Sequence, residues 1–95
     1  MTQQYLAGEL SLILARLQTV ATNQASARDV AFLRHKAEAG PLTALPAVAA
    51  RALGVTDGLC WDSLTRGDAG AFTRQAVIGA ELREFGVCAG LLGEG

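Results

Sequence analysis

A single histidine limits the chemistry that this chain of 95 residues could perform. His35 and Glu38 are three residues apart, which is the spacing of the paired ligands that one helix contributes to a di-metal carboxylate bundle. Such a site needs further carboxylates from facing helices, and only Glu9, Glu81 and Glu84 could supply them. By helical periodicity these three fall among exposed polar residues. We therefore expect no metal site and interpret His35 as a histidine at the boundary of a mixed helix face.

Nucleophilic catalysis and phosphate binding also lack their usual sequence context. Ser11, Ser26 or Ser63 could be combined with His35 in a triad, but no segment resembles a strained nucleophile turn or an oxyanion loop. The glycines of residues 67–70 precede a helix without a preceding strand or a lysine, so they indicate a linker and a helix cap. We expect no catalytic residues, no cofactor and no enzyme activity in the isolated chain.

The two cysteines, Cys60 and Cys88, stand in apolar contexts and form no CxxC pair. Two buried free thiols in a reducing compartment are the expected state. The N-terminal stretch has no positively charged region, and the apolar run behind it carries Glu9 and Arg16, which does not suit a signal peptide or a membrane span. We expect a cytoplasmic protein without membrane contact.

The composition indicates one compact domain over residues 1–95, since 51% of the residues are hydrophobic and 18% are charged. A net charge of −1 argues against a general affinity for nucleic acid, which requires an excess of basic residues. The unusual feature is the number of small residues, 18 Ala and 11 Gly. Together with seven Arg against one Lys, it is typical of a GC-rich bacterial genome.

The strongest predicted element is a helix from Tyr5 to about Thr22, where apolar residues recur every three or four positions. Tyr5 and Leu12 lie one heptad apart on its other side, so this helix is apolar beyond a single stripe and should touch more than one neighbour. A second helix is predicted up to Ala39, with Ser26 as its N-cap. Gly40 is the expected left-handed residue after it, and Pro41 follows as a stop.

Two short helices are predicted in the next segment. Thr43 would cap the first, which Gly54 would end, and Thr56 would cap the second over residues 57–65. In that second helix Leu59, Cys60 and Leu64 are expected to point inward.

Asp68 would cap a last helix that extends to Phe85, and whether it continues through residues 86–92 stays open. No stretch alternates with the period of a strand. The predicted fold is therefore an all-α, compact bundle of four or five helices.

The stretch Ala50 to Thr56 resembles the first helix and turn of DNA-binding helix-turn-helix proteins, in which a glycine makes the turn and a Thr or Ser caps the recognition helix. The helix that would read DNA offers Asp57 and Asp62 but no side chain suited to base edges. We interpret the corner at 48–66 mainly as a packing device. The alternative is a small DNA-binding transcriptional regulator, with Arg51, Arg66 and Arg74 on one face.

Two further features bear on partners. Trp61 lies toward an edge of its predicted helix, where it either covers the core or anchors an interface. Gly79, Gly86 and Gly90 share one ridge of the last helix, although interior glycines cost a helix roughly 0.5–1 kcal/mol each. Either the helix stops near Phe85 and leaves an apolar tail to be covered, or another helix approaches this ridge closely.

Both alternatives predict more apolar helix surface than a chain of this size can hide. We expect a small non-catalytic interaction or regulatory protein that forms a homodimer or binds another protein. An accessory subunit of an enzyme complex is a further alternative. The expected contact residues are Tyr5, Leu12, Trp61, Phe85, Val87, Leu91 and Leu92, with close helix packing at the three glycines of the last helix.

Overall fold

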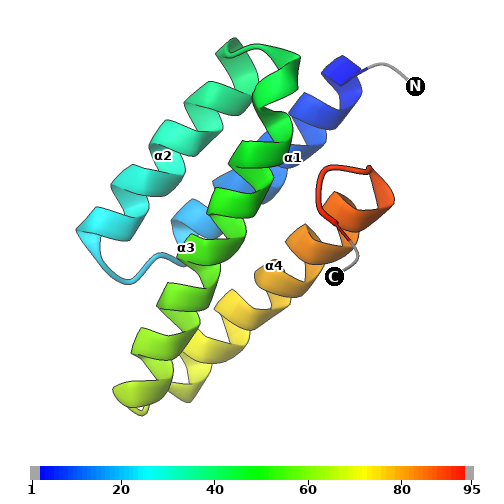
Figure 1. Ribbon diagram of the computed structural model, residues 1–95. Helices are drawn as coiled ribbons and strands as arrows, with labels where there is room; N and C mark the ends of the chain where they lie inside the picture. Colours follow the sequence, from blue (N-terminus) through cyan, green and yellow to red (C-terminus); the bar gives the residue numbers. More distant parts are fainter. Residues whose placement is uncertain (1–2, 94–95) are drawn as a thin grey trace.

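The computed structural model describes residues 3–93, with the side chains of residues 5–93. Its elements are α1 (Gln3–Thr19), α2 (Gln24–Ala39), the 3-10 turn η1 (Leu42–Ala44), α3 (Leu45–Thr65) and α4 (Ala69–Cys88). Successive helices run in opposite directions; α1 packs against α2 and α4, and α3 packs against α4 and α2 (Figure 1). The predicted all-α bundle is confirmed, with four α-helices in the described part of the chain.

The core is formed by apolar residues that recur at helical spacing on all four helices. Leucines dominate it, and Leu10, Leu14 and Leu17 of α1 are completely buried. Each buried leucine contributes roughly 1.5–3 kcal/mol relative to an exposed one. The other buried hydrophobic residues that pack together are Ile13, Val30, Leu33, Ala37, Leu45, Val48, Ala49, Ala52, Leu59, Ile78 and Leu82.

The predicted break at Gly54 is wrong, because α3 passes through it as one helix of 21 residues. Its buried positions on both sides of Gly54, among them Ala52, Thr56, Leu59 and Ser63, keep the same three- and four-residue spacing. A glycine costs a helix only about 1 kcal/mol relative to alanine. Burial of one continuous apolar face outweighs that cost, so no helix-turn-helix corner forms at 48–66.

Thr56 is consequently not a helix cap. It is buried in the middle of α3, and its Oγ1 donates a hydrogen bond of 2.8 Å to the carbonyl oxygen of Ala52. The continuous helix also changes which residue points inward near its end. Ser63 is buried, whereas Leu64, which was predicted to point inward, is 57% exposed.

The ends of α2 differ in detail from the sequence prediction. Asn23, and not Ser26, is the N-cap, and its Oδ1 accepts a hydrogen bond of 2.7 Å from the Ser26 amide. Gly40 ends the helix with a φ of −83°, so it does not take the left-handed conformation. A Cβ at Gly40 would instead lie 2.5 Å from the carbonyl oxygen of Lys36. The glycine is therefore needed for steric reasons.

The start of α3 also lacks the predicted cap. Thr43 lies inside η1, and α3 follows directly, with Ala44 at the N-cap position and no side-chain capping bond. Pro46 occupies the first turn of α3, where its missing amide hydrogen costs no helical bond.

The turn between α3 and α4 agrees with the sequence prediction. Gly67 has a φ of 74° and follows the last residues of α3. The amide of Asp68 donates 2.9 Å to the carbonyl oxygen of Ser63, which completes a Schellman motif. Asp68 is also the N-cap of α4, and its Oδ1 accepts a hydrogen bond of 3.0 Å from the Ala71 amide.

The C-terminal segment folds back onto the bundle. After Cys88 a second Schellman motif follows, in which Gly90 has a φ of 75° and the Leu91 amide donates 2.8 Å to the Gly86 carbonyl oxygen. Leu91 and Leu92 pack against the core and are only partly exposed. The question left open by the sequence is therefore resolved: α4 continues past Gly86 but ends before the tail.

Candidate functional site

The residues with metal-binding spacing do not meet further ligands. His35 is exposed on α2. Glu38 accepts hydrogen bonds from the Ser11 hydroxyl at 2.7 Å and from the Arg34 guanidinium at 3.0 Å. These interactions hold the pKa of Glu38 below its usual value, and the Ser11 hydrogen bond is the largest cause. Within the described residues, no group of three His, Cys, Asp or Glu side chains could hold a metal ion.

The two buried serines have structural partners. The Ser11 hydroxyl donates a hydrogen bond to Glu38, and Ser63 Oγ donates a hydrogen bond of 2.7 Å to Gln75 Oε1. The amide nitrogen of Gln75 in turn donates 3.0 Å to the carbonyl oxygen of Val20 in the α1–α2 loop. These bonds join α3, α4 and that loop. Sequence reasoning missed Gln75, although it occupies a position in phase with the buried face of α4.

Only one cysteine is shielded from solvent. Cys60 is half-buried on α3, and its burial, followed by the nearby Asp57 carboxylate, raises the pKa of its thiol. Cys88 is exposed at the end of α4, so the expectation of two buried thiols was wrong for this residue. Both are free thiols.

The predicted contact residues fall into two groups. Tyr5 and Leu12 on α1 and Trp61 on α3 are 53%, 61% and 69% exposed. The other group lies closer to the core. Phe85, Leu91 and Leu92 are half-buried against the core, and Val87 is half-buried on α4. The apolar tail is thus largely covered by its own chain, whereas the first group remains open to solvent.

The three glycines on the predicted ridge of α4 have different surroundings. A Cβ at Gly79 would lie 2.9 Å from Cγ2 of Thr56, so this glycine allows α3 and α4 to approach closely. A Cβ at Gly86 would overlap the side chain of Leu92. Gly90 lies beyond the end of the helix, and a Cβ there would meet nothing within 4 Å. Within the chain, the contacts at Gly79 and Gly86 are made by α3 and by the tail.

The outward side of α3 carries a surface of which the sequence analysis identified only Trp61. Gly54, Gly58 and Trp61 follow the spacing i, i+4 and i+7, so they share one face of the helix, and all three are exposed. A Cβ at either glycine would meet nothing within 4 Å. Their exposure means that no other helix of the described residues covers this face of α3. We call these three residues the α3 outer face.

Leu64 extends the apolar surface next to Trp61. It lines a cavity of about 140 Å³ together with Phe72, close to the turn between α3 and α4. The tip of this hairpin projects beyond α1 and α2 (Figure 1). Trp61 and Leu64 therefore lie on the part of the bundle that is least covered by the other helices.

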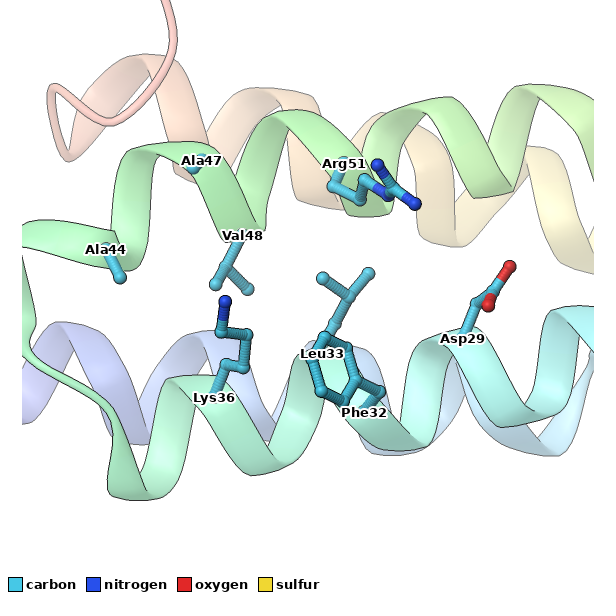
Figure 2. A pocket seen from close by; sticks show the side chains of 8 residues that line it. All are labelled: Asp29, Phe32, Leu33, Lys36, Ala44, Ala47, Val48 and Arg51. Atoms are coloured by element: carbon cyan, nitrogen blue, oxygen red, sulfur yellow. The ribbon is translucent and has the colours of Figure 1, made fainter.

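A groove of about 320 Å³ lies between α2 and α3. Figure 2 shows Phe32, Lys36 and Asp29 rising from α2, and Arg51 and Val48 facing them from α3. Lys36 Nζ lies 5.3 Å from the centre of the Phe32 ring. The lining thus combines an apolar floor with three charged side chains.

The three arginines named for the DNA-binding alternative lie in three different places in the structure. Arg66 pairs with Asp62 at 3.2 Å near the end of α3. Arg51 lines the α2–α3 groove, and Arg74 is exposed on α4. The helix-turn-helix corner on which the DNA-binding alternative was based is absent from the described residues, because α3 is continuous there.

Comparison with known proteins gives no relative on which to base a function: no protein-family model, no curated protein and no solved structure matches the chain. Within the described residues, no helix has the length and apolar character needed to cross a bilayer.

Proposed function

We propose that this protein is a small non-catalytic helical interaction module that self-associates through the α3 outer face. The observation that carries the proposal is Trp61, which is 69% exposed beside a helix face on which Gly54 and Gly58 leave open space. Tryptophan is enriched at binding hot spots because a large apolar ring is removed from water there.

The two glycines support a partner because no contact among the described residues requires them. They cost α3 roughly 0.5–1 kcal/mol each relative to alanine. Gly79 and Gly86 have close neighbours that exclude a Cβ, but Gly54 and Gly58 have none. Because these two positions carry no side chain, they leave a shallow depression beside Trp61, and a bulky side chain of another molecule can approach the helix backbone there.

A second copy of the chain supplies a matching shape. Trp61 and Gly54 are seven residues apart on one face, so an antiparallel pair of α3 helices with its two-fold axis near Asp57 and Gly58 places each Trp61 on the Gly54 of the other copy. The same surface is then used by both copies, as a two-fold interface requires. Asp57 lies close to this axis, so the two Asp57 carboxylates repel each other weakly.

The test is sedimentation velocity over micromolar concentrations with four single variants. Trp61→Ala should weaken dimerisation by about 2 kcal/mol, in the range of interface hot spots. Gly54→Leu should also weaken it, because the new side chain occupies the space that Trp61 of the other copy needs. Asp57→Asn should strengthen it. Leu12→Ala is the matched control, since Leu12 is 61% exposed but lies on α1, so this variant should leave the dimer unchanged.

A strictly monomeric wild-type protein would overturn self-association. A dimer that Leu12→Ala weakens and Trp61→Ala does not would place the interface on α1 instead. Circular dichroism of each variant checks that the helices persist, and Gly54→Leu is expected to raise the thermal stability of the monomer even as it disrupts the dimer.

A further inference from the structure

We propose a ligand site that is independent of self-association: the groove between α2 and α3 binds a small carboxylate with an apolar body. Its volume of about 320 Å³ suits a small molecule, since ligand pockets typically start at roughly 300 Å³. Its walls come mainly from α2 and α3, and the groove is open in the structure without a ligand (Figure 2).

The apolar part of the groove results from two small residues, Ala44 in η1 and Ala47 in the first turn of α3. Ala44 and Ala47 line it where larger side chains would fill the space between the helices. Leu33 and Val48 are buried and form its floor, while Phe32 is 60% exposed at its side. An alkyl chain or an aromatic ring placed here would cover Phe32 and displace water from apolar surface.

The charges in the groove favour an anion. Lys36 and Arg51 contribute two positive charges against the single carboxylate of Asp29. Figure 2 shows the Arg51 guanidinium on the side of α3 that faces α2, with Asp29 beyond it toward one end of the groove. Among the described residues neither Lys36 nor Arg51 has an ion-pair partner within 4.0 Å. A ligand carboxylate can therefore accept paired hydrogen bonds from Arg51 without displacing a partner.

These features select one class of occupant. The apolar body lies over Leu33 and Val48, and the carboxylate lies toward Arg51. Lys36, which ends beside Val48 in Figure 2, adds a second positive charge to the groove. A neutral molecule of the same length would lose the charged contact. A short anion would lose the apolar contact, so both parts of the ligand are needed for binding.

The probe is octanoate, titrated by isothermal calorimetry and followed by amide chemical shifts. We expect saturable binding with shifts concentrated on the helix segments that line the groove, and binding at least about tenfold weaker for octan-1-ol or acetate, because each lacks one of the two contacts. Equal binding of octan-1-ol and octanoate, or the absence of octanoate binding at millimolar concentration, would overturn the proposal.

Variants that remove one charge from the groove should change the affinity for octanoate in opposite directions, according to the sign of the charge removed. Arg51→Gln should weaken octanoate binding by about tenfold, and Lys36→Gln should weaken it by a smaller factor. Asp29→Asn should strengthen it, because a repulsive charge is removed. Arg74→Gln removes an arginine from α4 and is the matched control, with no expected effect. A decrease in affinity for Asp29→Asn would contradict this arrangement of charges.

Ala47→Leu provides a steric test, since its side chain would fill the groove while keeping good helix propensity. It should abolish octanoate binding with unchanged helicity. Repeating the titration in the Trp61→Ala variant separates the two proposals: the groove should bind octanoate equally well when the α3 outer face is disabled. Loss of binding in Trp61→Ala alone would place the ligand on the α3 outer face and overturn the groove site.

Discussion

The hydroxyl of Ser63 donates a hydrogen bond of 2.7 Å to Oε1 of Gln75, and both side chains are buried between α3 and α4. Nε2 of the same Gln75 side chain donates a hydrogen bond to the carbonyl oxygen of Val20 in the α1–α2 loop. This pair therefore joins the α3–α4 hairpin to the α1–α2 hairpin at the α1–α2 loop.

Ser63→Ala should destabilise the protein by about 1–3 kcal/mol, because Oε1 of Gln75 would remain buried without a donor. Chemical denaturation followed by circular dichroism measures the change. Thr73→Ala is the matched control: it also removes a hydroxyl from the hairpin, but Thr73 is exposed and bonds only the carbonyl oxygen of Ala69 within its own helix. Equal losses of unfolding free energy for the two variants would show that the buried Ser63–Gln75 hydrogen bond adds no more stability than the exposed one.

Gly79→Ala should lower stability by about 1–3 kcal/mol, as expected for overpacking, even though alanine is the better helix former. The cause is Cγ2 of Thr56, which would lie 2.9 Å from the new Cβ. The Thr56 side chain cannot easily rotate away, since its Oγ1 donates a hydrogen bond to the Ala52 carbonyl oxygen. Thr56→Ser removes the methyl group and keeps the hydroxyl, so the double variant should recover much of the loss. Additive losses in the double-mutant cycle would contradict the proposed contact.

The interaction between Ser11 and Glu38 should make stability depend on pH in the acidic range. The pKa of Glu38 is lower in the folded protein than its ordinary value of 4.5, so its contribution is complete above that pH. The contribution is lost as the pH falls through the lowered, folded-state pKa, where Glu38 takes up a proton. Ser11→Ala removes the largest cause of the shift. Its melting temperature should fall below that of the wild type at pH 7, and the difference should shrink under acidic conditions. A difference that stays constant from pH 7 to pH 3 would rule out this linkage.

The two thiols should react with Ellman's reagent at different rates at pH 8. Cys88 is exposed and should react in the fast phase. Cys60 is half-buried, and its raised pKa leaves less of the reactive thiolate, so it should react in a slow phase. Cys88→Ser should remove only the fast phase, and Cys60→Ser only the slow one. The opposite assignment would mean that α3 opens more readily than the end of α4.

Local sequence features determined much of this fold. The spacing of Leu10, Leu14 and Leu17 predicted the buried face of α1, because residues three or four apart share one side of a helix. Gly67 and Asp68 predicted the turn into α4, since one takes the left-handed conformation and the other has a side-chain oxygen that accepts a backbone hydrogen bond. These effects act within a few residues, so no tertiary partner is needed to recognise them.

The continuity of α3 depended on tertiary packing. Gly54 weakens a helix without forbidding it, and Thr56 suits either a cap or a buried position beside Gly79. A signal was present in the sequence, since the apolar positions before and after Gly54 stay in phase, but local residue preferences favoured a break. Burial of Ala52, Thr56 and Leu59 decided the outcome, because contact with α4 stabilises one long face more than a corner.

Exposure was likewise decided by the arrangement of the helices. The sequence marked Trp61 and Leu92 alike as apolar contact candidates, because hydrophobicity and period do not tell which surface a neighbour will cover. In the folded chain the tail brings Leu92 onto Gly86, whereas Trp61 stays 69% exposed. The sequence by itself therefore predicted apolar side chains on the helix surface, and only the tertiary structure decided that α1 and α3, rather than the tail, leave them exposed. The reason is that coverage depends on contacts between residues distant in the chain.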